Sequence, residues 1–240
     1  MKDFLQDLVA HTHSIGLLTV KIDASEQKTL ISSISSDQFL IMSATTHEPI
    51  ANINGVFGMP NLNKLDLHLK CPEYKDNAQI TFITDKRGDE VIPTGIHFQN
   101  SSGDFQNDYR LQSKQIVELK IKDLETLQFK WDVEFNPSQS SIQKLKYQAA
   151  AHSEQTVFEV ATKDNNIVIS FGDAISDAGS FVFHGDISGK LRKVWSFPKS
   201  HVISVLNLVG DKTMKITDAG GLQITVDSGI AEYNYTFPAH

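Results

Sequence analysis

Apolar residues recur at helical spacing in four short stretches of this chain, and strand-like patterns fill most of the rest. Residues 3–10 and 138–150 predict amphipathic helices, and Ser138 is a suitable cap for the second. The other two helices are expected to begin at Pro60 and Pro198, because proline is tolerated in the first turn. All four are short, so the pattern indicates a protein built mainly from sheet.

Strands are predicted where β-branched and aromatic residues alternate with polar ones between turn clusters. In the first half of the chain they cover residues 16–22, 28–34, 38–44, 49–57, 78–84 and 91–98. In the second half they cover residues 156–162, 167–173, 180–187, 213–217, 221–227 and 231–237. Residues 100–108 are polar and predict a loop. The last helix is expected to bury Val202, Val205 or Leu206, and Val209, and to stop at Gly210.

The order of these elements runs twice along the chain. An offset of roughly 140 residues between matching elements indicates two similar domains of the α+β class, each with two short helices against β-sheet. Residues 110–135 are long, alternating and charged, and predict a strand, a crossover and a second strand. We therefore predict a first domain over 1–115, a crossover over 116–130 and a second domain over 131–240.

The composition is that of an ordinary globular protein, with 240 residues, 40% hydrophobic and 21% charged. No apolar run approaches the roughly 20 residues that span a bilayer, so we expect no membrane partner. The N-terminus carries Asp3 and Asp7 where a signal peptide would be apolar. A single cysteine, Cys71, fits a reducing cytoplasm.

The net charge of −7 argues against a general basic coat for nucleic acid. A polyanion responds to the local field, however, and a basic stripe can lie on an acidic body. Basic residues gather near the predicted helices at Lys64, Lys70, Lys144, Lys146 and Lys199. Each lysine taken alone is better explained by a solvated helix face, and only the bias of several helices together favours a role in binding DNA.

Catalytic motifs are missing, which leans against an enzyme. The segment Gly185–Lys190 resembles a phosphate loop, but it has one residue too few between its glycines, and Leu191 replaces the hydroxyl residue. His11 and His13 have no third ligand nearby, so a polar helix end explains them better than a metal site. We expect no catalytic residue, no metal and no cofactor.

Several segments resemble the DNA sliding clamps, the processivity factors of large tailed phages. Residues 54–62 (NGVFGMPNL) are similar to the segment that leads into the second clamp helix, and 164–169 (DNNIVI) to a strand-turn-strand. The tail 231–240 (AEYNYTFPAH) is similar to the clamp tail. The resemblance implies the DNA clamp fold and a homotrimeric ring that encircles duplex DNA without sequence preference. It also implies DNA polymerase and clamp loader as partners, and contacts with phage transcription factors.

The resemblance assigns two sets of site residues. The expected DNA-facing set is Lys64, His68, Lys70, Lys144, Lys146, Lys199, Lys190, Arg192 and Lys193. The expected groove for a partner peptide is formed by Leu124, Leu127, Tyr235, Phe237 and Pro238. Apolar residues near a terminus either pack at a core edge or line a docking site, and both alternatives stay open here.

Two other functions fit the same composition. A phage tail or baseplate protein with two β-rich domains also lacks catalysis, but it does not require lysines on the helices of both halves. A β protein that binds a small ligand is the third alternative, with Trp131, Phe135 and Trp195 as candidate pocket residues. Core packing accounts for these aromatic residues more simply.

Overall fold

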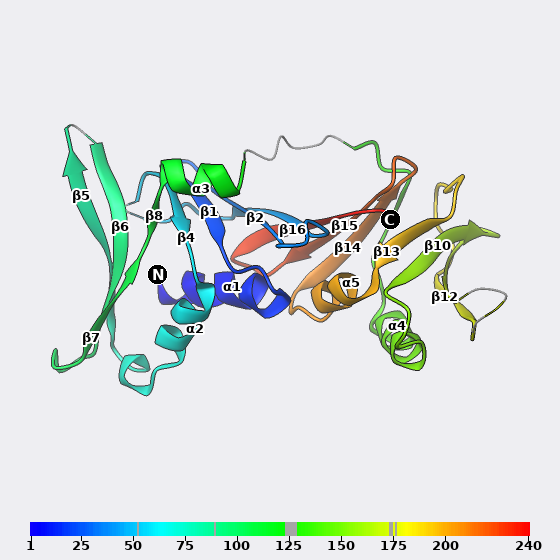
Figure 1. Ribbon diagram of the computed structural model, residues 1–240, viewed down its shortest axis with the longest axis horizontal. Coiled ribbons are helices and arrows are strands. Elements are labelled where there is room, and N and C mark those ends of the chain that lie inside the picture. The colour runs from blue at the N-terminus through cyan, green and yellow to red at the C-terminus, as the bar shows by residue number, and fades with distance from the viewer. Residues whose placement is uncertain (52, 89, 123–128, 173–174, 176) are drawn as a thin grey trace. The chain divides into compact units, whose positions relative to one another are not determined.

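The computed structural model describes residues 1–51, 53–88, 90–122, 129–172, 175 and 177–240 (Figure 1). Within them the α-helices are α1 (Lys2–His11), α2 (Leu62–Lys70), α3 (Lys114–Lys120), α4 (Gln139–Ala151) and α5 (Lys199–Leu206). Two 3-10 turns are η1 (His13–Ile15) and η2 (Pro72–Tyr74). Helices and sheets alternate along the chain, which confirms the predicted α+β class.

Sixteen strands lie in the described residues. The first eight are β1 (Val20–Ala24), β2 (Thr29–Ile34), β3 (Ile41–Thr46), β4 (Gly55–Met59), β5 (Gln79–Arg87), β6 (Glu90–Gln99), β7 (Gln106–Arg110) and β8 (Gln112–Ser113). The others are β9 (Val133–Phe135), β10 (Val157–Lys163), β11 (Asn166–Phe171), β12 (Gly179–His184), β13 (Trp195–Pro198), β14 (Asp211–Thr217), β15 (Gly221–Asp227) and β16 (Ala231–Pro238).

The chain forms two compact units. Unit 1 consists of Met1–Gln38, Met42–Glu125 and Ser228–Tyr233, and unit 2 consists of Phe39–Ile41, Thr126–Asp227 and Asn234–His240. Each unit therefore takes a short segment from the half of the chain that forms the other. The predicted domain boundaries contain no such exchange, because local patterns along a sequence carry no information on which distant segment a strand joins.

The same plan of elements occurs in both units. Strands are adjacent in the order β4-β1-β2-β3 in unit 1 and β13-β10-β11-β12 in unit 2. A second helix and a three-stranded meander follow in each half of the chain, β5-β6-β7 after α2 and β14-β15-β16 after α5. The start of β16, Ala231–Tyr233, belongs to unit 1. The first helices α1 and α4 begin 137 residues apart (139 minus 2), and so do the second helices α2 and α5 (199 minus 62). The plan thus repeats at a constant offset.

The helices form because one face of each is apolar and packs inward. Leu5, Leu8 and Val9 are buried in α1, and Ile142, Leu145 and Ala149 are buried in α4. Helix α4 also has the expected cap, since the hydroxyl of Ser138 accepts a hydrogen bond of 3.1 Å from the amide of Ser141. Within the part of the chain that the structure describes, every helix is too short or too polar to cross a membrane.

The structure corrects the sequence-based prediction at several elements. β7 begins at Gln106, within the predicted loop over 100–108, and β13 precedes the helix expected at Pro198. The predicted strand at 16–22 begins only at Val20, because Gly16 ends a 3-10 turn with a φ of 88°. Val209 was expected to be buried but is 83% exposed, since α5 ends at Leu206, one turn early.

The largest correction falls on the crossover, which begins with a helix. The sequence predicted a strand, a crossover over 116–130 and a second strand within 110–135, without a helix, but residues 114–120 form α3, which buries only Val117. Helix α3 packs on β4 at Gly58, where an added Cβ would lie 2.8 Å from the Val117 side chain. The absence of a side chain at Gly58 therefore leaves room for α3 to pack on β4.

Candidate nucleic-acid and partner interfaces

The outward face of α2 carries three of the expected DNA-facing residues, and they differ in their surroundings. Lys64 is exposed, and its ammonium forms no hydrogen bond or ion pair with another described residue. The Lys70 ammonium lies 2.6 Å from Asp66 on the same helix, a solvated pair with little effect on stability. His68 stacks on Phe98 at 5.2 Å. Burial, and then the charge of Lys64, lowers the pKa of His68, so this residue is neutral at pH 7.

Helix α4 presents a similar face. Lys144 is exposed and Lys146 is half-buried, and neither has an ion-pair partner among the described residues. The sequence analysis missed a large apolar residue on each of these faces, Leu67 on α2 (62% exposed) and Tyr147 on α4 (75% exposed). Both residues lie outside the buried apolar stripe of their helix. Their position in the helical repeat could have identified them from the sequence as exposed apolar residues.

Lys199 has a structural role that its sequence position did not reveal. From the first turn of α5 its ammonium donates to the carbonyls of Ala149, at 3.1 Å, and His152, at 2.7 Å, at the end of α4. Lys2 has a related role in unit 1, where it donates to the carbonyls of Tyr74 and Lys75 at the end of η2, at 2.8 and 2.7 Å. Lys199 thereby ties the start of α5 to the end of α4, and Lys2 ties the start of α1 to the end of the 3-10 turn η2.

Positive charge is therefore uneven over the helices. The exposed residues of α1 are Asp3, Gln6 and Ala10, none of them basic. Helix α5 contributes only Lys199, whose ammonium already binds carbonyl groups. Among the helical residues predicted to face DNA, the described structure leaves Lys64, Lys144 and Lys146 as the cations without a partner.

The segment 190–193 between β12 and β13 holds three exposed cations on an ordered backbone. Leu191 is buried, and both oxygens of the Asp218 carboxylate accept from the Arg192 amide at 2.9 Å. The Lys193 ammonium lies 5.6 Å from the centre of the Trp195 ring, a cation–π distance. The side chains of Lys190 and Arg192 extend into solvent from this anchored segment.

The expected partner groove takes a different form in the structure. Tyr235 and Phe237 are fully buried in β16, so they pack in the core, which was one of the two alternatives, and they offer a peptide no surface. Pro238 is exposed. Leu124 and Leu127 lie outside the described residues. Alternation placed the aromatic residues on one face of the last strand, but it could not show that the face points inward.

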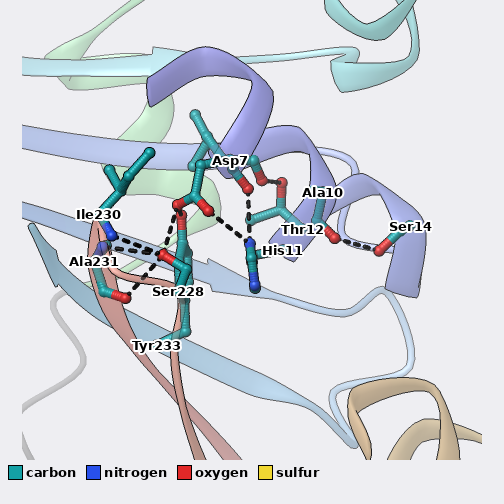
Figure 2. Close-up of polar contacts among 10 residues, drawn as sticks. Asp7, Ala10, His11, Thr12, Ser14, Ser228, Ile230, Ala231 and Tyr233 are labelled. Carbon is teal, nitrogen blue, oxygen red and sulfur yellow. Dashed lines mark hydrogen bonds and ion pairs between the residues drawn. The ribbon is translucent and has the colours of Figure 1, made fainter. Parts of the chain in front are cut away.

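A buried polar network fixes the end of α1 (Figure 2). The Asp7 carboxylate is 10% exposed and lies 3.1 Å from His11 Nδ1, 2.8 Å from the Tyr233 hydroxyl and 3.1 Å from the Ser228 hydroxyl. Burial would raise the pKa of Asp7, but hydrogen bonds from His11, Tyr233 and Ser228 outweigh it, and the pKa is lowered. His11 also stacks on Tyr233 at 4.6 Å.

These contacts show that His11 is a packed residue of the interior of unit 1. The sequence analysis assigned it to a polar helix end, and the structure adds its carboxylate and aromatic partners. No group of three or more His, Cys, Asp or Glu side chains among the described residues is arranged to hold a metal ion.

Comparison with known proteins bears on the fold. No protein-family model matches the sequence. A search of the curated proteins finds no match either. Among solved structures, the chain is similar to a chain in the structure described as the C-terminal region of FEN-1 bound to A. fulgidus PCNA. The TM-score is 0.72 at 9% sequence identity, over 100% of this chain and 96% of that one. PCNA is a sliding clamp, a non-enzymatic scaffold, so this chain has a clamp-like fold.

Proposed function

We propose that this protein is a sliding clamp, which encircles duplex DNA as a homotrimeric ring and tethers a replicative polymerase for processive synthesis. The observation that carries the proposal is a clamp-like fold over the whole length of the chain. It is supported by exposed lysines without partners on helices of both units, Lys64 on α2 and Lys144 on α4. The protein acts as a scaffold without catalysis of its own.

Lysines on helix faces suit a protein that must hold DNA and still slide. Their attraction to phosphate is long-ranged and independent of sequence. Only a few of them lack a partner here, so the attraction is modest and depends strongly on salt. The exposed side chains Lys190, Arg192 and Lys193 add a second basic segment for the same duplex.

Ring closure uses the open edges of the sheets. In the described residues β7 ends the three-stranded sheet and β12 ends the four-stranded sheet. Pairing β7 of one copy with β12 of the next is a head-to-tail contact, which closes into a ring when the rotation per copy allows it. Such pairing also covers edges that would otherwise promote aggregation.

The partners follow from this role. We propose a DNA polymerase, a clamp loader and, in a phage, transcription factors that bind the same ring. Because Tyr235 and Phe237 are buried, the groove for a partner peptide is proposed without them.

Two measurements test the ring. Light scattering should give a mass of about 80 kDa, three copies of the 26.7 kDa chain. Protein loaded on a nicked circular duplex should stay bound through a salt wash and be released when the circle is cut once. A monomer at micromolar concentration that a loader does not assemble contradicts the proposal. If the protein stays on the DNA equally well after the circle is cut, the result favours a structural protein of the tail or baseplate kind.

A further inference from the structure

The two units differ at one edge of their meander. In unit 2 the outer edge of β14 is covered by β9, which pairs Phe135 with Met214 and Val133 with Ile216. Val133 and Phe135 are 1% and 6% exposed, so β9 fills the core at this place. Phe135 also stacks on His184, the last residue of β12, at 4.8 Å.

In unit 1 the corresponding edge is open. Strand β5 opens the meander there, and the sheet order β5-β6-β7 leaves its outer edge without a partner strand among the described residues. A cavity of about 850 Å³ lies beside it. Ile80, Thr81 and Phe82 all line this cavity. Successive residues of a strand point to opposite faces, so the cavity runs along the strand edge.

The walls of the cavity match the position that β9 occupies in unit 2. They include Met1 and Phe4 at the start of α1, the first helix of unit 1. In unit 2, β9 lies in the corresponding position, just before the first helix α4. They also include Thr46, the last residue of β3. Its counterpart in unit 2 is His184, the last residue of β12, which stacks on Phe135 of β9. The Thr46 hydroxyl is buried and has no hydrogen-bond partner, although its residue is 6% exposed. An unsatisfied buried hydroxyl is costly, and a bound group could satisfy it.

The apolar walls and the rim charge indicate what fits. Phe4, Ile50, Ile80 and Phe82 are half-buried, so each offers apolar surface to an incoming side chain. Glu48 is exposed at the rim, and no ion-pair partner is recorded for it in the described part of the chain. A segment that resembles β9 but carries a basic residue is complementary to this surface in shape and charge.

We propose that the outer edge of β5 is a docking site for an extended segment of a partner protein. The segment adds as a strand to β5, places large apolar side chains at alternate positions in the cavity and sets a lysine or arginine beside Glu48. Main-chain hydrogen bonds to β5 supply affinity, and the apolar pockets supply selectivity. The site lies within unit 1 and does not depend on the ring or on DNA.

A peptide derived from β9 tests the site on the full chain. The binding peptide is WDVKFNP, which is residues 131–137 with a lysine in place of Glu134. The control peptide is WDDKDNP, in which both apolar anchors are aspartate. We expect WDVKFNP to slow hydrogen exchange of backbone amides within 79–84, and WDDKDNP to leave them unchanged. Equal effects of the two peptides, or no slowing within 79–84 at millimolar WDVKFNP, overturn the proposal.

The rim charge provides a second test that leaves the core intact. Glu48→Lys should lower the affinity for WDVKFNP by about two- to fivefold, the range of an exposed ion pair. The same substitution should raise the affinity for the parent peptide WDVEFNP, which carries glutamate at this position. Glu26→Lys is the matched control, since Glu26 is exposed in the β1–β2 turn and should change neither affinity. Equal effects of the two variants overturn the assigned rim contact. If hydrogen exchange within 79–84 slows when the protein concentration is raised without any peptide, a second copy of the chain occupies the edge of β5. That result overturns the assignment to a partner protein.

Discussion

Asp7 and Lys144 occupy the same place in the two units, 137 residues apart on the first helix of each (144 minus 7). Asp7 is nearly buried and holds His11, Tyr233 and Ser228 around its carboxylate. Lys144 is exposed to solvent and has no partner among the described residues. The neighbouring buried positions agree, since Leu8 matches Leu145. The repeat therefore preserves the apolar stripe of the helix, whereas the polar positions serve packing in one unit and the surface in the other.

The meanders differ in the same way. In unit 2, β9 closes the edge of β14 with two buried side chains, whereas in unit 1 the edge of β5 borders a cavity. Removing side chains from the closed edge and from the open edge should therefore have different consequences.

The largest effect is expected at the closed edge. Phe135→Ala should lower the free energy of unfolding by about 3–5 kcal/mol, because it removes a buried ring and leaves a cavity. Phe4→Ala at the open edge should cost about 1.5 kcal/mol or less, since Phe4 already borders solvent. Urea unfolding of both variants measures the difference. Equal losses mean that the open edge is packed as tightly as the closed one.

The Asp7 network should give the next largest effect. Asp7→Asn should destabilise the protein at pH 7 by about 1–3 kcal/mol, because a carboxylate that accepts three hydrogen bonds is replaced by an amide. The folded pKa of Asp7 lies below its ordinary value of 3.8. Its stabilisation is thus complete above about pH 4 and is lost as the pH falls through the lower folded value.

Unfolding measured from pH 7 down to pH 3 tests this sign. The difference in unfolding free energy between parent and Asp7→Asn should narrow as the pH falls below about 4. Asp3→Asn is the control, since Asp3 is exposed on the same helix and should change stability by about 0.5 kcal/mol or less. A difference that widens as the pH falls below about 4 contradicts the lowered pKa of Asp7.

The helices were the part of this fold that the sequence predicted best. Periodicity located α1 and α4, and Ser138 was identified as a cap before its contact was known. Periodicity did not reveal α3, because only Val117 is buried among residues 114–120 and no apolar stripe repeats at helical spacing. The packing of α3 at Gly58 is a tertiary contact that no local pattern encodes.

The candidate site was less predictable, because charge along a sequence does not show where a side chain is held. Lys199 and Lys64 both looked like free helix cations, yet the Lys199 ammonium binds the carbonyls that end α4. For Tyr235 and Phe237 the sequence left core packing and a docking groove as alternatives, and both residues are buried. The open edge of β5 was invisible, since it emerges only when the strand partners of the two units are compared.

The lysine ties between helices should have a smaller effect, equal in the two units. Lys2→Met and Lys199→Met each keep the aliphatic stem and remove the ammonium, so each should cost about 1 kcal/mol of unfolding free energy. Thermal unfolding of the two variants measures this. If Lys199→Met also weakens retention on DNA while Lys2→Met does not, the Lys199 ammonium reaches phosphate in addition to its carbonyl partners.

The smallest change in stability is expected from the lysines without partners. Joint replacement of Lys64, Lys144 and Lys146 by glutamate should alter the unfolding free energy by about 0.5 kcal/mol or less per site, because none has a partner to lose. Retention on DNA should fall, since three attractions to phosphate become repulsions. The difference from the parent should narrow as salt rises and screens the charges.

A matched variant decides whether position or total charge matters. Lys28, Lys86 and Lys163 are exposed at strand ends and turns, and replacing all three by glutamate changes the net charge by the same amount. If the helix lysines face the duplex, only their reversal should shorten retention on nicked circles at low salt. Equal losses in the two triple variants would reflect overall charge, which acts at a distance on any polyanion. Unchanged retention in both would leave Lys64, Lys144 and Lys146 as solvated helix residues, and would leave segment 190–193 to attract the duplex.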